Sequence, residues 1–300
     1  MNGSAPLVFD RALGRRRLAR AKAGGYAGFL LDHAVSDLAE RLEPVTRSFA
    51  SGLDIGTPGP QAAAMLLGSG RVQHMVRMAP TREGRQDGPG ALLGDEEALP
   101  FGPERFDLIV SCLALQGVND LPGGLIQARR SLRPDGLFIG CLLGGNTLTE
   151  LRQSFAAAES EIEGGVSPRV APFADVRDLG GLLQRAGFAL PVADNDSVTV
   201  RYATPFGLMA DLRAMGLTNN LVDRRRTPLR RATLLRMAAV YAERFADPDG
   251  RVRATFDLVW LSGWAPHESQ QKPLRPGSAK SRLADALGVP EHRIEEGGAG

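Results

Sequence analysis

Two largely apolar segments constrain the fold of this chain more than any other feature. Residues 106–115 read FDLIVSCLAL, and residues 137–143 read LFIGCLL. Strands that are apolar on both sides are typical of a parallel sheet whose two faces are covered by helices. Strand-like and helix-like segments alternate over the first 145 residues. The sequence therefore predicts an α/β fold with a Rossmann-like, doubly wound sheet.

The other elements are assigned from the spacing of their apolar residues. Further strands are predicted at 49–54, 72–78, 197–203 and 254–265, with a short one near 91. Helices are predicted at 26–43, 61–70, 122–132, 147–163 and 175–187, and a polar loop at 81–91. The pattern divides the chain into an N-terminal helical segment at 1–48, a main domain at 49–265 with a helical insertion at 205–245, and an extended tail at 266–300.

Charge and composition exclude several classes of protein. Arginine makes up 33 of the 36 basic residues, but 34 acidic residues leave a net charge of +2, so we expect no nucleic-acid binding. No apolar run reaches the roughly 18–20 residues that cross a bilayer, so no transmembrane segment is expected. Cys112 and Cys141 lie in apolar runs, and no Cys/His spacing suits zinc. Without a secretory signal at the N-terminus, the prediction is a cytoplasmic protein with no metal site.

A turn rich in glycine and proline follows the first predicted strand. Residues 54–60 read DIGTPGP, and glycine at such a turn lets the backbone approach a nucleotide-like ligand with no Cβ in the way. Ligands of open α/β sheets bind outside the carboxyl ends of the strands. An ordinary turn from strand to helix is the alternative, and this pattern alone leaves both interpretations open.

An acidic turn follows the third predicted strand. Residues 94–101 read GDEEALPF, and the strand FDLIV begins shortly after them at 106. A carboxylate there can accept a hydrogen bond from an exocyclic amine, with Leu99 and Phe101 as apolar cover. Solvated loop charges are the alternative for these acidic residues.

Taken in order and spacing, these two turns and the turn LRPDGLF at 132–138 resemble class I S-adenosylmethionine-dependent methyltransferases over residues 49–145. In that family the first loop cradles the methionine part of the cofactor, an acid after the second strand binds the ribose, and the acidic turn meets the adenine. The resemblance implies S-adenosylmethionine as the cofactor, with Asp54, Gly56, Gly59, Asp95, Glu96 and Ser111 as its binding residues.

A narrower resemblance spans nearly the whole chain. The segments FDR at 9–11, FGLMADLRAMG at 206–216 and AVY at 239–241, and a tail that reads HESQ, KP and GSA between 267 and 279, are similar to the mitochondrial complex I assembly factor 5 family and its bacterial relatives. This resemblance implies a seven-stranded, mostly parallel sheet with an antiparallel last strand and a helical insertion before it. It also implies a protein substrate or partner, which in that family is an arginine-bearing subunit of respiratory complex I.

Three positions depart from the pattern of these families. Pro58 and Pro60 stand where the first loop usually has glycine, and proline removes the N–H that a ligand carboxylate uses. Arg77 stands where an acid would bind the ribose, and arginine cannot accept a hydrogen bond. Two hypotheses follow. The chain is an S-adenosylmethionine-dependent methyltransferase or related arginine-modifying enzyme, or it is a non-catalytic assembly or binding protein with weakened or lost cofactor binding.

The helical insertion is expected to cover the mouth of the site. The polar or flexible side chains placed best to meet a substrate there are Tyr202, Met215, Thr218, Asn219 and Tyr241. Core packing is the alternative for Met215 and Tyr241, and a helix-ending turn is the alternative for Asn219. The catalytic residue stays unassigned, because no side chain stands out as a general base.

Overall fold

The computed structural model describes residues 7–86 and 90–271. The chain divides into two units, Met1–Pro266 and His267–Gly300. The fold and the site described below belong to the first unit. The KP and GSA motifs of the predicted tail lie outside the described residues.

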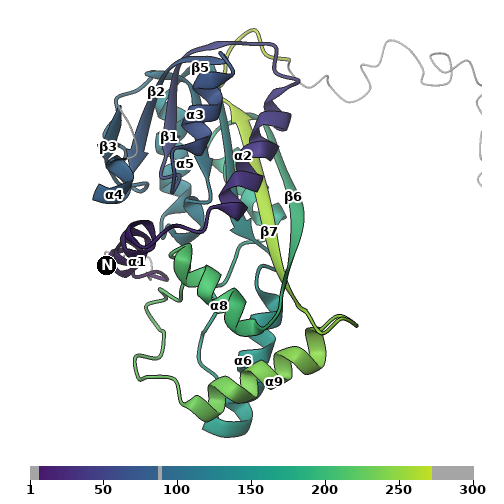
Figure 1. The fold of residues 1–300 in the computed structure, drawn as a ribbon. Coiled ribbons are helices and arrows are strands. Elements are labelled where there is room, and N and C mark those ends of the chain that lie inside the picture. The colour runs from purple at the N-terminus through teal and green to yellow at the C-terminus, as the bar shows by residue number, and fades with distance from the viewer. Residues whose placement is uncertain (1–6, 87–89, 272–300) are drawn as a thin grey trace, which may run out of the picture. The chain divides into compact units, whose positions relative to one another are not determined.

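The described strands form one seven-stranded sheet in the order β3-β2-β1-β4-β5-β7-β6 (Figure 1). They are β1 Phe49–Ile55, β2 Val72–Ala79, β3 Ala91–Leu93, β4 Phe106–Cys112, β5 Leu132–Gly144, β6 Ala189–Tyr202 and β7 Val252–Trp264. The first five strands are parallel to their neighbours in this group, and β7 runs antiparallel to both β5 and β6. The predicted Rossmann-like sheet with an antiparallel last strand is confirmed.

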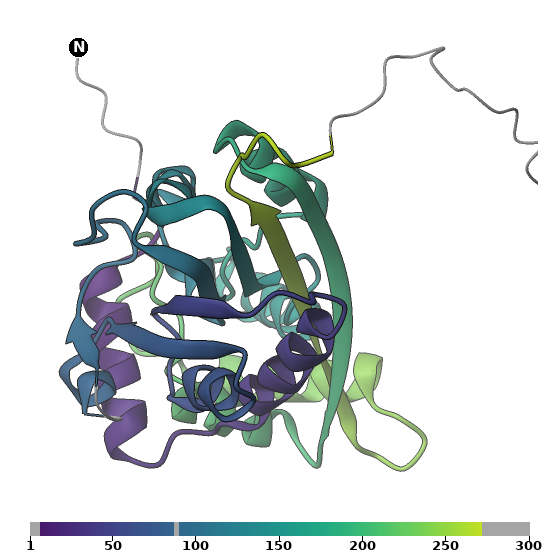
Figure 2. The ribbon, with the colours of Figure 1, turned by 90° about the horizontal axis from the view of Figure 1, so that it is seen from above.

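Helices cover both faces of this sheet (Figure 2). They are α1 Arg11–Ala23, α2 Phe29–Leu42, α3 Gln61–Gly68, α4 Arg82–Arg85, α5 Leu121–Ser131, α6 Thr149–Glu163, α7 Val176–Arg185, α8 Pro205–Ala214 and α9 Arg231–Phe245. Side chains of β4 alternate between two apolar clusters: Leu108 and Val110 join the residues of α2, and Ile109 joins those of α5 and α7. This strand is mostly apolar because both of its faces are buried.

The predicted helical insertion consists of α8 and α9, between β6 and β7. Figure 1 shows α6, α8 and α9 together at one end of the sheet, and α6 packs along α9. Because α6 follows the end of β5 after a short turn, this group lies at the carboxyl end of the parallel strands. That is the end at which open α/β sheets bind their ligands.

Two elements differ from the sequence-based expectation. β6 begins at Ala189 rather than at 197, because its polar part lies at the outer edge of the sheet and pairs with β7, with Asp194 opposite Trp260. The apolar pattern of 1–48 does not indicate α1 as a separate helix. The one buried residue of α1 is Ala21, so this helix has no apolar face that periodicity could detect.

Candidate functional site

A cavity of about 160 Å³ opens at the carboxyl ends of the parallel strands. Its floor is apolar and includes Leu30, Leu113, Leu143, Leu148 and Phe173, and its polar lining includes Arg11, Arg15, Tyr26, Glu96, Gln116 and Asn220. A cavity of about 150 Å³ is known to accept one benzene molecule. A volume of this size suits a single planar group.

The first loop reaches this cavity through Gly56. The residue has a φ of +74°, and a Cβ added to it would lie 2.8 Å from Oε1 of Glu96 and 3.0 Å from Cβ of Ala114. Only glycine combines this left-handed conformation with so close an approach. The conformation of this turn therefore requires glycine, whereas the approach of a nucleotide-like ligand to it stays a prediction. The group that approaches it is the side chain of Glu96.

Beneath the loop, Asp54 and Arg77 form a buried ion pair between adjacent strands. The two residues are opposite each other in the β1–β2 register, and Nε of Arg77 lies 3.5 Å from Oδ2 of Asp54. Asp54 is 1% exposed, and its Oδ1 atom has no hydrogen-bond partner among the described residues. Burial raises the pKa of Asp54 to about 6, against the opposing effects of Thr57 and Arg77. The pair is therefore part of the core of the sheet.

Carbonyl oxygens of the first loop are bound by cations of the chain. Nη2 of Arg77 donates to the carbonyl of Gly59 at 2.7 Å and to that of Thr57 at 3.4 Å, and Nη1 donates to the carbonyl of Gly84 at 3.4 Å. Nζ of Lys22 in α1 donates to the carbonyl of Pro58. The backbone at 57–59 thus directs three successive carbonyl groups toward positive charges.

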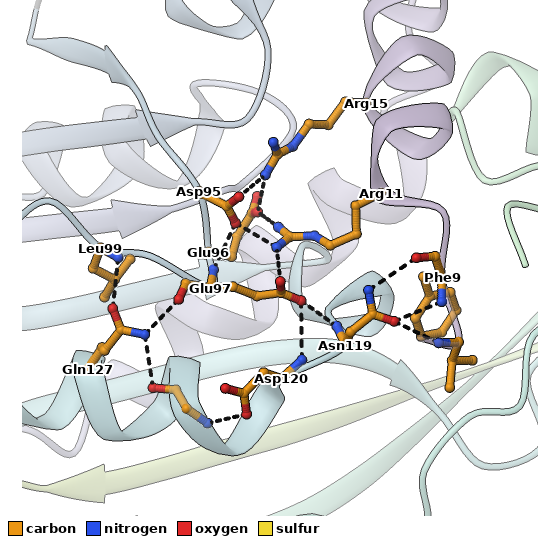
Figure 3. Close-up of polar contacts among 12 residues, drawn as sticks. Phe9, Arg11, Arg15, Asp95, Glu96, Glu97, Leu99, Asn119, Asp120 and Gln127 are labelled. Carbon is orange, nitrogen blue, oxygen red and sulfur yellow. Dashed lines mark hydrogen bonds and ion pairs between the residues drawn. The ribbon is translucent and has the colours of Figure 1, made fainter. Parts of the chain in front are cut away.

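The acidic turn surrounds one guanidinium group (Figure 3). Nη1 of Arg11 lies 2.6 Å from Oδ1 of Asp95 and 2.7 Å from Oε2 of Glu97, and Nη2 pairs with Oε2 of Glu96. A second arginine, Arg15, lies 2.8 Å from Oδ2 of Asp95. Three carboxylates and two guanidinium groups therefore meet at the cavity, and α1 supplies both arginines.

The three carboxyl groups differ in their surroundings. Burial raises the pKa of Glu96, which is 5% exposed. Burial also acts to raise the pKa of Asp95 and Glu97, but the guanidinium groups of Arg15 beside Asp95 and of Arg11 beside Glu97 outweigh it and lower both values. The lowered pKa values keep Asp95 and Glu97 ionised at neutral pH.

Hydrogen bonds from within the turn, from Asn119 and from Gln127 of α5 hold the acidic turn in place (Figure 3). Oδ1 of Asp95 accepts a hydrogen bond from the backbone N–H of Glu97 at 2.9 Å, and Nε2 of Gln127 in α5 donates to the carbonyl of Glu97 at 2.8 Å. The backbone N–H of Asn119 donates to Oε1 of Glu97 at 2.6 Å. Oδ1 of Asn119 also accepts from the N–H of Phe9 at 2.8 Å, so one residue fixes both the turn and the segment that leads into α1.

Helix α1 is attached mainly by polar contacts. Asp10 caps it by accepting a hydrogen bond from the N–H of Leu13 at 2.9 Å. The helix carries six basic residues and no acidic one. Arg11 and Arg15 attach the helix to the acidic turn. Arg17 attaches it to a second segment by donating to the carbonyls of Thr218 and Asn219. With only Ala21 buried, the helix depends on charge pairing rather than on an apolar face.

The predicted site residues fall into two groups. Gly56, Glu96, Met215 and Thr218 line the cavity. Ser111 donates to the carbonyl of Ile55 at 2.7 Å inside the sheet, and Gly59 accepts from Arg77 as described. Tyr241 donates to the carbonyl of Arg253 at 2.7 Å and is fully buried, Tyr202 is buried in the same apolar cluster, and Nδ2 of Asn219 donates to the carbonyl of Pro168 at 2.7 Å. The structure does not bring these last three to the described lining of the cavity.

Several lining residues were not indicated by the sequence-based reasoning. Arg11 is one, although it belongs to the FDR segment that carried the family resemblance. Tyr26 and Gln116 are others, and Oε1 of Gln116 is buried with no hydrogen-bond partner among the described residues. No local pattern marks these two residues, because only the fold brings the segment before α2 and the segment after β4 to the same cavity.

The residues present do not fit S-adenosylmethionine. Its ribose hydroxyls need an acceptor at the end of β2, where Arg77 offers only donors and is itself buried under the loop. Pro58 and Pro60 have no N–H for the carboxylate, and the carbonyls at 57–59 are already bound by Arg77 and Lys22.

Comparison with known proteins identifies the family. Residues 53–140 match a family model described as a methyltransferase domain. The arginine-hydroxylase NDUFAF5, mitochondrial, of Danio rerio is 39% identical over 287 residues, which cover 93% of this chain and 89% of the relative. The chain belongs to the NDUFAF5 family. The human member is 41% identical over 280 residues, covering 91% of this chain and 81% of the relative.

Proteins with other names also match this chain. A malonyl-[acyl-carrier protein] O-methyltransferase of Halorhodospira halophila is 37% identical over 245 residues, which cover 78% of this chain and 81% of the relative. The crystal structure of the YcgJ protein from Bacillus subtilis matches with a TM-score of 0.54 at 14% identity, covering 79% of this chain and 99% of that one. The [4+2]-cyclase SpnF matches with a TM-score of 0.50 at 14% identity, covering 88% and 98%. Proteins of this fold therefore carry more than one kind of name, and fold alone does not identify the reaction.

No helix at 7–86 or 90–271 has the length and apolar character needed to span a membrane. Within the same ranges, no group of three or more His, Cys, Asp or Glu side chains is arranged to hold a metal ion.

Proposed function

We propose that this NDUFAF5-family chain binds an arginine side chain of a protein partner at the acidic turn and acts on that side chain. The observation that carries the proposal is the convergence of Asp95, Glu96 and Glu97 on the guanidinium of Arg11. With Arg15 included, three carboxylates face two guanidinium groups, which leaves an excess of acceptors. Arginine matches such a site, because its planar fork presents five N–H donors to carboxylates.

The surroundings of the turn favour the same ligand. Hydrogen bonds from Gln127 and Asn119 hold the turn in place, so its acceptors are arranged before a ligand arrives. The adjoining cavity has an apolar floor and a volume of about 160 Å³, which suits the methylene stem and planar head of one arginine. In the structure Arg11 fills this position from within the chain, and a partner's arginine would have to replace it.

The family supports an arginine-bearing protein as the partner. Relatives that match over about nine-tenths of this chain are named arginine hydroxylases. The resemblance set out in the sequence analysis extends this to a subunit of respiratory complex I, so that the chain would take part in the assembly of that complex. A cytoplasmic location stays a prediction alongside this proposal.

Replacement of Arg11 tests the proposal. The probe is a blocked tripeptide with one central arginine, and its binding to the full chain is measured by titration calorimetry. Arg11→Gln removes the internal competitor, so we expect this variant to bind the peptide at least about tenfold more tightly than the unmodified chain, a difference of about 1.4 kcal/mol. Glu97→Gln added to Arg11→Gln should reverse most of that gain.

Two controls make the result specific. Arg16→Gln changes an exposed arginine of the same helix that has no ion pair with any described residue, and it should leave the affinity unchanged. Peptides with citrulline or lysine in place of arginine should bind the Arg11→Gln variant more weakly. Equal binding of the arginine and citrulline peptides would contradict the proposal, because citrulline keeps the shape but lacks the charge.

The second candidate function is methyl transfer from S-adenosylmethionine to the same protein partner. The left-handed turn at Gly56 beside the cavity and the match to a methyltransferase domain favour it. In that function the cofactor would meet Asp54, Gly56, Gly59, Asp95, Glu96 and Ser111, and the substrate would meet Tyr202, Met215, Asn219 and Tyr241. It requires Arg77 to leave the first loop. Transfer of a radiolabelled methyl group to a protein of the cell lysate would support this candidate, and labelling of none would weigh against it.

A further inference from the structure

We infer that Arg77 is a built-in replacement for the ligand of the first loop, and that this chain works without bound S-adenosylmethionine. The inference concerns β1, β2 and the residues 56–60, and it goes beyond the proposed function. It remains valid whether or not the acidic turn binds arginine.

Each of the three nitrogen atoms of the Arg77 guanidinium has a partner. Its side chain is 6% exposed. Nε faces Asp54, Nη1 donates to the carbonyl of Gly84 at the start of α4, and Nη2 donates to the loop carbonyls of Thr57 and Gly59. One side chain thus joins β1, the loop and α4. These are the elements between which a ligand of the first loop would have to lie.

The direction of the loop's peptide groups agrees with this role. A loop that wraps an anionic group turns its N–H groups inward to form a concave site. Here the carbonyls at 57 and 59 point to Arg77, while the N–H of Gly56 donates to the carbonyl of Met78 at 2.8 Å. Pro58 and Pro60 have no N–H to offer. The loop is therefore arranged to receive a cation, and Arg77 supplies it.

Charge repulsion acts in the same direction. S-adenosylmethionine carries a positive sulfonium and a positive ammonium group, and the first loop already holds the charges of Arg77 and Lys22. Like charges brought together in a site select against a ligand. The carboxylate of Asp54 cannot compensate, because it is buried in the sheet and paired with Arg77.

Equilibrium binding tests the inference directly. S-adenosylmethionine and S-adenosylhomocysteine are titrated separately into the full chain by calorimetry, up to about 1 mM. We expect no saturable heat from either compound. A dissociation constant in the micromolar range for either one would overturn the inference, and it would leave the arginine-peptide experiment unaffected. Conversely, failure of the arginine peptide to bind would not alter this result.

Hydrogen exchange of the loop provides the second measurement. Arg77→Met removes the cross-link and keeps a long apolar stem, and we expect the N–H groups of Gly56, Thr57 and Gly59 to exchange at least about tenfold faster. Arg82→Met is the matched control, because Arg82 is an exposed arginine of α4, and it should leave their exchange unchanged. If Arg77→Met leaves the loop as protected as in the unmodified chain, Arg77 is not the residue that holds it and the inference is wrong. A variant that does not fold at all leaves the calorimetric titration of the unmodified chain to decide.

Discussion

Arg77 and Arg11 both place a guanidinium on a loop at the carboxyl end of the sheet, but they reach it from different parts of the molecule. Arg77 comes from the interior of β2, is 6% exposed and is paired with the buried Asp54. Arg11 comes from α1, is 14% exposed and is paired with a turn that faces the cavity. The first contact is part of the sheet, and the second depends on a helix with one buried residue.

This difference shows that the same chemical group can be a permanent part of a fold or an exchangeable occupant of a site. Segments open locally with a free energy that depends on how much they bury. Removing Arg77 would require β2 to separate from β1, whereas removing Arg11 requires only that α1 move away. We therefore expect the first loop to be closed to ligands and the acidic turn to be open to exchange.

The largest expected effect is that of Arg77→Met on stability. The change leaves Asp54 as an unpaired buried carboxylate, and breaking a buried pair in this way typically costs about 3–5 kcal/mol. Urea denaturation of the full chain measures the free energy of unfolding. Arg82→Met, at an exposed site, should stay within about 0.5 kcal/mol of the unmodified chain. If Arg77→Met lowers the free energy of unfolding by no more than Arg82→Met does, Arg77 is not a permanent part of the fold, and the contrast between Arg77 and Arg11 is wrong.

The second prediction concerns the pH dependence of Asp54. Its pKa is 3.8 ordinarily and about 6 in the folded chain, so the folded state binds the proton more tightly. Its contribution to stability is therefore complete below the ordinary value and is lost as the pH rises through about 6. Two pKa units correspond to about 3 kcal/mol.

Comparison with Asp54→Asn isolates this contribution, because asparagine does not titrate. The free energy of unfolding of the unmodified chain, relative to that of the variant, should fall between about pH 4 and pH 7 and remain level above that. A difference that does not change with pH would mean that Asp54 is not buried with a raised pKa, and the description of the Asp54–Arg77 pair would then be wrong.

The third prediction is that salt affects the amide hydrogen exchange of α1 but not that of the first loop. Raising the ionic strength from 0.01 M to 1 M shortens the Debye length from about 30 Å to about 3 Å, which weakens the ion pairs of Arg11 and Arg15. Amide hydrogens of α1 should then exchange several-fold faster, while those of residues 56–60 should not. Equal responses of the two segments would contradict the view that only α1 is held by exposed charges.

The smallest expected effect is that of Tyr241→Phe. The change removes a hydroxyl that donates to the carbonyl of Arg253, and the loss of such a hydrogen bond costs about 1 kcal/mol. Stability should fall by that amount in urea denaturation. Affinity of the Arg11→Gln background for the arginine peptide should not change, since Tyr241 does not line the cavity. A large loss of affinity would instead restore Tyr241 as a substrate-binding residue.

The sheet and much of its connectivity could be predicted from the amino-acid pattern. Mostly apolar runs such as 106–112 require burial on both faces, and that requirement is local to each strand. Gly56, Pro58 and Pro60 likewise act through their own backbone, so the special character of the first loop could be predicted without coordinates. The replacement of an acid by Arg77 was also visible in the sequence.

Only the tertiary structure decided which charges meet. Arg11 pairs with Asp95 across a separation of 84 residues, and no spacing rule relates a basic helix to a distant acidic turn. The same holds for Arg77 and Asp54, whose pairing depends on the register of β1 and β2. The sequence-based assignment of Tyr202, Asn219 and Tyr241 to the mouth of the site rested on the insertion as a whole. Which of its side chains line the cavity depends on how α8 and α9 pack against α6, and that packing is set by long-range contacts rather than by local pattern.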